Sequence, residues 1–224
     1  MISKNMQRIY EMNTKVKICG IKNSDEIEII NRYPVDYIGF IFTKSKRQIS
    51  IDEAGRLRKR LRADIKVVGV FMDEDESFIL KAVNDVALDA IQLHGDNDID
   101  SIKRFMDNDK INEVFKTVAV SHPESIKKAN ELQRYCDRIL LDTGSGGKSG
   151  GTGKCFDWGL TDQLDFKEEI ILAGGLNPEN IRDAIKKVHP YMVDMNSGLE
   201  TNMIKDNDKI RKAFDMIKEG NEHE

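Results

Sequence analysis

The chain is predicted to fold as a single-domain α/β protein, a (β/α)8 barrel, on three observations. Short apolar or β-branched runs recur eight times, and an amphipathic segment follows each of them. The spacing is even, and no change of composition divides the 224 residues. Chains of this length commonly form one such barrel. We therefore expect an N-terminal extension over residues 1–14 and the barrel domain over residues 15–220.

The predicted strands follow one another at regular intervals. In chain order they span 15–21, 36–42, 65–71, 88–94, 113–120, 138–142, 169–174 and 191–197. An open, doubly wound sheet is the alternative arrangement of such units. It is disfavoured because its usual GxGxxG motif does not follow the first strand, which runs into "CGIKNSDE" instead.

Helix-start signals support several of the helices between these strands. Each signal is a capping residue, followed by an acidic residue three positions later or by proline at the first helical position. The pairs are Asn23 with Glu26, Ser50 with Glu53, and Asn177 with Pro178.

Composition excludes several classes of function. A net charge of -4 gives no general attraction to nucleic acid or to an anionic membrane. The longest apolar runs fall well short of the roughly 20 residues that span a bilayer. Residues 1–15 carry no apolar segment of signal-peptide type, so we expect a cytoplasmic protein. Three cysteines and four histidines are scattered without paired spacing, which predicts neither a disulfide framework nor a metal site.

Two strand ends carry groups suited to proton transfer. In a (β/α)8 barrel the active site lies at the C-terminal ends of the strands. Strand alternation places Lys17 and Cys19 on the inward face, where a nearby ammonium favours the thiolate. Asp142 ends the sixth strand on the same face as Leu140, and a carboxyl beside apolar side chains can act as a general acid. The alternatives are a small core residue for Cys19 and a turn residue for Asp142.

The same edge of the barrel offers groups for a ligand. Gly174 and Gly175 follow the seventh strand, while Ser197 and Gly198 follow the eighth. Barrels often hold a phosphate there on backbone N–H groups, so we expect a phosphorylated small molecule as ligand. Arg47, after the second strand, can hold a carboxylate bidentately, or it can belong to a solvated basic loop.

The glycine-rich segment 144–153 is not a nucleotide-binding P-loop. The glycine that this motif requires five places before Gly147 is Asp142. The position of the segment, directly after Asp142, favours a mobile lid over a tolerated insertion.

Taken together, these segments resemble the phosphoribosylanthranilate isomerase family of tryptophan biosynthesis. The resemblance covers nearly the whole chain after residue 14, and its most specific feature is the strand-one cysteine combined with the GGTG segment after the strand-six aspartate. The matching stretches are "KICGIKN" (17–23), "GFIFTKSKRQI" (39–49), "VGVF" (68–71), "QLHGD" (92–96), "LLDTGSGGKSGGTGKCFDW" (140–158), "LAGGLNPENI" (172–181) and "VDMNSGLE" (193–200).

The resemblance implies an Amadori rearrangement of N-(5'-phosphoribosyl)anthranilate without a cofactor, catalysed by a monomer. It assigns Cys19 as general base, Asp142 as general acid and Arg47 as the contact to the anthranilate carboxylate. The phosphate would lie on the four residues named above, and His94 would line the site in an undefined role. The chain departs from the family pattern at Asn196, where serine is usual, and in "TNMIKD" after Glu200, which lacks a common glycine.

Two other functions compete with this hypothesis. Another phosphosugar isomerase or epimerase is one, but pentose-phosphate epimerases use metal-binding histidines at several strand ends, and only His94 lies at such a position here. A non-catalytic barrel that binds a phosphometabolite is the other, against which the presence of both Cys19 and Asp142 argues.

Overall fold

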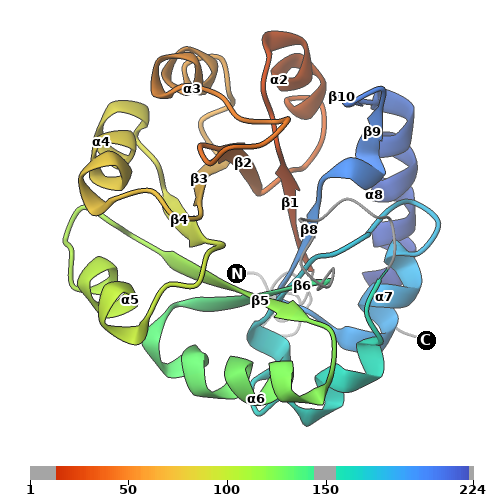
Figure 1. Cartoon of the computed structure of the whole chain (residues 1–224). Helices are drawn as coiled ribbons and strands as arrows, with labels where there is room; N and C mark the ends of the chain where they lie inside the picture. Colours follow the sequence, from red (N-terminus) through yellow and green to blue (C-terminus); the bar gives the residue numbers. More distant parts are fainter. Residues whose placement is uncertain (1–13, 144–154, 222–224) are drawn as a thin grey trace, which may run out of the picture.

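The strands of this protein close into a barrel. A computed structural model describes residues 14–143 and 155–221. Eight parallel strands pair in chain order, and the first pairs with the last (Figure 1). They are β1 (Lys15–Cys19), β2 (Tyr37–Ile41), β3 (Lys66–Phe71), β4 (Ala90–Leu93), β5 (Val114–Val120), β6 (Arg138–Thr143), β7 (Ile171–Leu172) and β8 (Met192–Met195). The predicted (β/α)8 barrel is confirmed.

Helices surround the barrel on its outside (Figure 1). They are α2 (Ser24–Ile30), α3 (Ile51–Arg58), α4 (Glu76–Val86), α5 (Ile99–Met106), α6 (Pro123–Leu132), α7 (Ile181–Val188) and α8 (Asn207–Asn221). The described part of the connection from β6 to β7 departs from the expected amphipathic helix, because it forms two 3-10 helices, η2 (Trp158–Gln163) and η3 (Lys167–Glu169). A further 3-10 helix, η1 (Gln133–Tyr135), follows α6.

Strand alternation builds two separate apolar layers. On β1, Val16 and Ile18 belong to the large cluster between strands and helices. Inside the barrel, a second cluster fills the part nearer the N-terminal ends of the strands with side chains from successive strands. Its buried members are Tyr37, Val68, Ala90, Phe115, Leu140, Ile171, Ala173 and Met192. The interior of the barrel is therefore filled by side chains nearer the N-terminal ends of the strands, and room is left towards their C-terminal ends.

The helix-start predictions differ in outcome. Ser50 and Glu53 form the complete capping box. Asn23 caps α2 by accepting from the Glu26 N–H, but the Glu26 side chain accepts from the Lys22 N–H rather than completing the box. The prediction at Asn177 is wrong, because α7 begins at Ile181 and Asn177 forms a turn with its side chain accepting from the Glu179 N–H.

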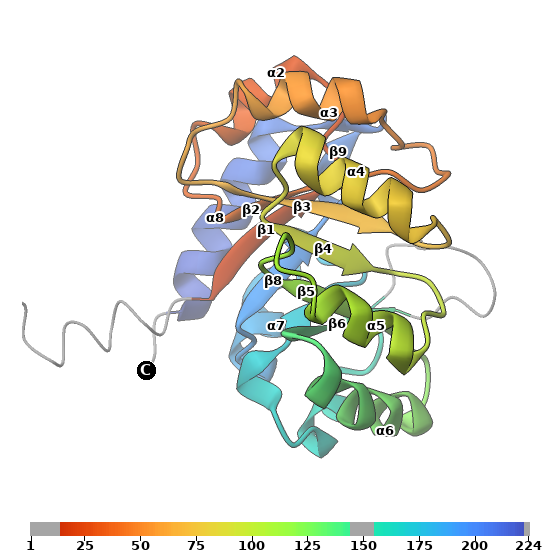
Figure 2. The same cartoon turned by 90° about the vertical axis from the view of Figure 1, so that its left-hand side faces the viewer.

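The C-terminal ends of the strands carry the structures that shape the site. After β8 the chain forms the 3-10 helix η4 (Ser197–Leu199) and a short antiparallel hairpin of β9 (Glu200–Thr201) and β10 (Ile204–Lys205), which leads into α8. Figure 2 shows the strands from the side, with the helices packed around them. No helix among the described residues is long and apolar enough to cross a membrane. The predicted extension and the proposed lid, 144–153, lie outside these residues except for Thr14.

Candidate functional site

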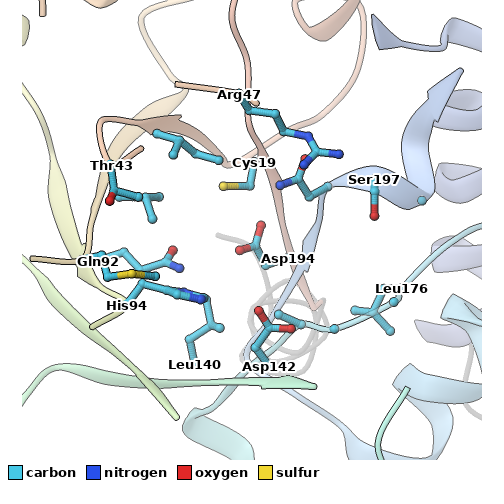
Figure 3. Close-up of a pocket in the computed structure, with 18 residues that line it drawn as sticks. Cys19, Thr43, Arg47, Gln92, His94, Leu140, Asp142, Leu176, Asp194 and Ser197 are labelled. Carbon is cyan, nitrogen blue, oxygen red and sulfur yellow. The ribbon is translucent and has the colours of Figure 1, made fainter. Parts of the chain in front are cut away.

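A pocket opens at the C-terminal ends of the strands and brings together every site residue that the sequence predicted. The predicted residues among its lining are Cys19, Arg47, His94, Asp142, Gly174, Gly175, Ser197 and Gly198. In Figure 3, Cys19 and Asp142 come from opposite sides of the pocket, with Asp194 between them. Residues from seven of the strands or the loops that follow them thus converge on one cavity, as the barrel topology requires.

Cys19 is the last residue of β1, lines the pocket and is 5% exposed. Parallel pairing places it beside Gly39 of β2, where a β-carbon would come within 2.6 Å of Cys19 Sγ. Glycine at position 39 therefore provides the space that the thiol occupies. Burial raises the pKa of Cys19, and the positive charge of Lys17 opposes that rise.

A buried ion pair lies below the thiol. Lys17 Nζ contacts Asp194 Oδ2 at 2.5 Å and Gln92 Oε1 at 2.9 Å. Burial alone would lower the pKa of Lys17, but the charges of Asp194 and Cys19 raise it, so the ammonium stays charged. The second carboxylate oxygen of Asp194 is buried without a hydrogen-bond partner among the described residues. This oxygen belongs to a residue that lines the pocket, and it can accept a hydrogen bond from a ligand hydroxyl.

Sequence reasoning assigned no role to Asp194 or Gln92. Strand alternation could have indicated a role for these two residues. Each is a polar residue within an apolar run, and each lies on the inward face of its own strand. Their pairing with Lys17 depends on the register of β1 with β8, where Lys17 lies opposite Asp194. The sequence alone does not fix that register.

Asp142 ends β6 with its carboxyl directed into the pocket (Figure 3). Its Oδ1 accepts from the N–H of Thr143 at 2.7 Å. Burial raises the pKa of Asp142, while that hydrogen bond and the charge of Lys17 partly oppose the rise. A raised pKa increases the fraction of the protonated form, which is the form that a general acid needs.

His94 lines the same pocket from the end of β4. Burial lowers the pKa of His94, and the charges of Lys116 and Lys17 lower it further, so the imidazole is neutral at pH 7. Its Nδ1 is buried and has no hydrogen-bond partner among the described residues. The ring can therefore offer a hydrogen bond to a ligand rather than a positive charge.

The loops after β7 and β8 form a cradle of backbone groups. Gly174 and Gly175 have φ values of +84° and +70°, which favour glycine. A β-carbon on Gly198 would lie 2.0 Å from the carbonyl oxygen of Leu176, so this residue lets the two loops meet closely. Both loops line the pocket, as the predicted phosphate site requires.

Arg47 reaches the rim of the pocket from the loop between β2 and α3. Its Nε and Nη2 donate to Glu200 Oε1 and Oε2 at 2.8 and 2.7 Å. Lys44 and Lys46 of the same loop are exposed, whereas the Arg47 side chain is only 16% exposed and is paired with Glu200. Within the described ranges, no group of three histidine, cysteine or acidic side chains could hold a metal ion.

Comparisons with known proteins agree on one family. The family model of N-(5'-phosphoribosyl)anthranilate (PRA) isomerase matches residues 16–216. The N-(5'-phosphoribosyl)anthranilate isomerase of Clostridium kluyveri is 39% identical over 204 residues, covering 91% of this chain and 98% of the relative.

Solved structures give the same result. The crystal structure of phosphoribosyl anthranilate isomerase from Thermotoga maritima matches with a TM-score of 0.82 and 37% identity, covering 92% of this chain and 98% of the other. A structure of such an isomerase in complex with reduced 1-(o-carboxyphenylamino)-1-deoxyribulose 5-phosphate matches with a TM-score of 0.79 and 36% identity, with the same coverage of both chains.

Proposed function

Because the chain belongs to the N-(5'-phosphoribosyl)anthranilate isomerase family, we propose that Cys19 and Asp142 carry out the proton transfers of its reaction. The enzyme is an aldose-ketose isomerase of tryptophan biosynthesis that acts on a phosphorylated small molecule. This membership decides against the two competing functions, a different phosphosugar enzyme and a non-catalytic binding barrel. The observation that carries the proposed mechanism is the convergence of a buried thiol and a partly buried carboxyl on one pocket.

The reaction needs one acid and one base. Asp142 gives its proton to the ring oxygen of N-(5'-phosphoribosyl)anthranilate, and the bond from C1' to that oxygen breaks. The nitrogen lone pair forms a C=N bond, which leaves a protonated Schiff base and acidifies the C2' proton. The Cys19 thiolate removes that proton, and the electrons of the C–H bond form an enolamine. Tautomerisation of the enolamine gives 1-(2-carboxyphenylamino)-1-deoxyribulose 5-phosphate.

The remaining pocket residues would orient the substrate. The backbone of Gly174, Gly175, Ser197 and Gly198 would hold the phosphate, while Arg47 would hold the anthranilate carboxylate. Asp194 lies between acid and base, with an oxygen available for a hydroxyl of the opened sugar. Neutral His94 would offer a further hydrogen bond. The mechanism uses no metal or organic cofactor.

The first experiment follows the loss of anthranilate-type fluorescence when the purified protein meets freshly generated phosphoribosylanthranilate. The wild type is expected to react rapidly, and Cys19→Ser and Asp142→Asn are each expected to lose roughly 10² to 10⁴ in kcat, the usual contribution of a proton-transfer group. Cys136→Ser is a matched control, because Cys136 is buried away from the pocket and its Sγ contacts backbone carbonyls of Leu132 and Arg138. Near-wild-type turnover in either site variant would refute the role assigned to that residue.

A second experiment tests the phosphate cradle. Gly198→Ala would place a methyl group against the Leu176 carbonyl and separate the two loops. The variant should bind inorganic phosphate more weakly and raise KM for the substrate, with a smaller effect on kcat. Gly55→Ala is the control, because a β-carbon there would make only an ordinary contact of 3.6 Å with Asp85. Unchanged phosphate binding in a folded Gly198→Ala variant would place the phosphate elsewhere.

A further inference from the structure

The hairpin after β8 holds a buried ion pair at the edge of the pocket. Antiparallel pairing sets Lys205 opposite Glu200, and a two-residue turn of Asn202 and Met203 joins the two short strands. Lys205 Nζ contacts Glu200 Oε1 at 2.8 Å. The side chains are 0% and 4% exposed, respectively. Neither residue lines the pocket itself, so any effect on a ligand must act through a neighbouring side chain.

That neighbour is Arg47. Glu200 accepts from Arg47 Nε and Nη2, which fixes the plane of the guanidinium. Burial raises the pKa of Glu200, but Arg47 and Lys205 together lower it to about 2, so the carboxylate remains ionised at any pH of interest. The sulfur of Met203 lies 3.7 Å from Arg47 Nη2 and closes the same side of the group.

The geometry leaves the opposite edge of the guanidinium for a ligand. A guanidinium has five N–H groups, and Glu200 uses only the edge formed by Nε and Nη2. The described structure gives Nη1 no acceptor, whereas Nη2 donates to Glu200 Oε2 and to Met203 Sδ, so the N–H groups of Nη1 are available to another carboxylate. Without Glu200 the long arginine side chain would have several rotamers available, and ordering it on binding would cost entropy.

Lys205 also connects this arrangement to the loop after β8. Its Nζ also donates to the backbone oxygen and Oδ1 of Asn196 at 3.2 and 3.0 Å. Asn196 lines the pocket and directly precedes Ser197 and Gly198 of the cradle. One buried ammonium therefore holds both the partner of Arg47 and the residue that begins the second cradle loop.

We propose that Glu200, held by Lys205, is a positioning residue that aims Arg47 at the aromatic carboxylate of the substrate. The inference rests on the proposed function, since it assumes that Arg47 binds that carboxylate. Glu200 does not touch the substrate and takes no part in proton transfer. Its contribution appears in the recognition of one chemical group, which distinguishes it from a residue that only stabilises the fold.

The test measures the dissociation constants of two ligands by calorimetry. One is reduced 1-(o-carboxyphenylamino)-1-deoxyribulose 5-phosphate, and the other is the phenylamino counterpart without the carboxyl group. The wild type should prefer the carboxylated ligand. Glu200→Gln should reduce this preference by roughly tenfold, in the range of couplings between contacting residues, and should leave binding of the second ligand almost unchanged. Glu28→Gln is the matched control, because Glu28 pairs with Arg60 on the surface.

The outcomes separate the inference from the function on which it rests. A Glu200→Gln variant that keeps the full preference, or that loses affinity equally for both ligands, overturns the positioning role. A wild type without any preference shows that Arg47 does not bind the carboxylate, which refutes that part of the proposed function as well. If Glu200→Gln does not fold, Glu200→Asp replaces it, because the charge is kept while the shorter side chain should still weaken the preference.

A second variant tests the connection through Asn196. Lys205→Met should reduce the preference for the carboxylated ligand and should also weaken binding of inorganic phosphate, whereas Glu200→Gln should affect only the former. Phosphate binding that is unchanged in a folded Lys205→Met variant would contradict the connection to the cradle.

Discussion

Cys19 and Gly39 lie side by side in the parallel pairing of β1 and β2, and a β-carbon at position 39 would come within 2.6 Å of Cys19 Sγ. The thiol can occupy its place in the pocket only because the neighbouring strand carries no side chain there. The position of the proposed base is thus determined by two residues on different strands.

Gly39→Ala is therefore expected to displace the thiol. A misplaced base lowers kcat by about 10²-fold, the cost of an error of roughly 1 Å in a reacting group, while KM changes less because the ligand contacts remain. Steady-state kinetics with a thermal unfolding control measures both effects. Gly55→Ala on α3, with its nearest contact at 3.6 Å, should leave kcat unchanged. Equal kcat in Gly39→Ala and wild type would show that the position of Sγ does not limit the reaction.

The pH dependence follows from the raised pKa values of both proposed catalytic groups. Burial raises the pKa of Asp142 and that of Cys19. The active form needs protonated Asp142 together with the Cys19 thiolate. As pH rises above the pKa of Asp142, the acid form declines by about tenfold per unit while the thiolate fraction grows by about the same factor. The product is flat between the two pKa values and falls above the pKa of Cys19, where the thiolate no longer increases.

Asp142→Asn separates the two limbs of this profile. The amide does not titrate, so the small residual kcat/KM should rise with pH and then stay level, without the alkaline decline. The measurement is kcat/KM against pH for both proteins, with circular dichroism to confirm that each stays folded over the range. An alkaline decline that persists in Asp142→Asn would assign that limb to another group, since coupled sites report macroscopic pKa values.

The sequence predicted the barrel and the pocket residues because each depends on local alternation. Inward and outward residues on β1 follow from a period of two, and the end of a strand marks the pocket side. The network beneath the thiol depends on which strands become neighbours. Lys17 meets Asp194 only because β1 closes on β8 in a particular register, and Gly39 matters only because it lies opposite Cys19.

The helix start at Asn177 and the hairpin after β8 show a second reason why the structure differs from what the sequence predicts. At Asn177 the expected cap was wrong because the side chains of Asn177 and Asn180 satisfy the backbone N–H groups of Glu179 and Asn177 in a turn first. The sequence shows that "TNMIKD" lacks a glycine, but the consequence depends on the backbone angles of the turn. Asn202 and Met203 both adopt positive φ, at 52° and 65°.

Met203→Gly should therefore stabilise the protein. Two consecutive residues with positive φ form the type of hairpin turn that Asn-Gly favours, and a methionine in this region is strained. Removing its β-carbon should raise the free energy of unfolding by about 0.5 kcal/mol, after the entropy gained by the unfolded chain and the lost contact of the Met203 sulfur with Arg47 are subtracted. Chemical denaturation measures this change.

Met106→Gly is a control for that substitution, and its expected effect on stability has the opposite sign. Met106 is the last residue of α5, where the backbone is helical, so the same change should destabilise the protein by up to about 1 kcal/mol. If both variants lose stability to the same extent, the backbone strain at Met203 has no energetic consequence.

The buried pair of Lys17 and Asp194 should show strong coupling in a double-mutant cycle. Lys17→Met leaves an uncompensated carboxylate and Asp194→Asn leaves an uncompensated ammonium, each at a cost of about 3–5 kcal/mol, because both side chains are buried. The double variant removes both charges and should lose less stability than the sum of the single variants. Urea denaturation measures the stability of all four proteins.

The exposed pair of Arg60 and Glu28 is the control for this cycle. Substituted as Arg60→Met and Glu28→Gln, it should show almost no coupling, because solvent screens the two charges. Additive losses at Lys17 and Asp194 would mean that water or a neighbouring group such as Gln92 replaces the missing partner.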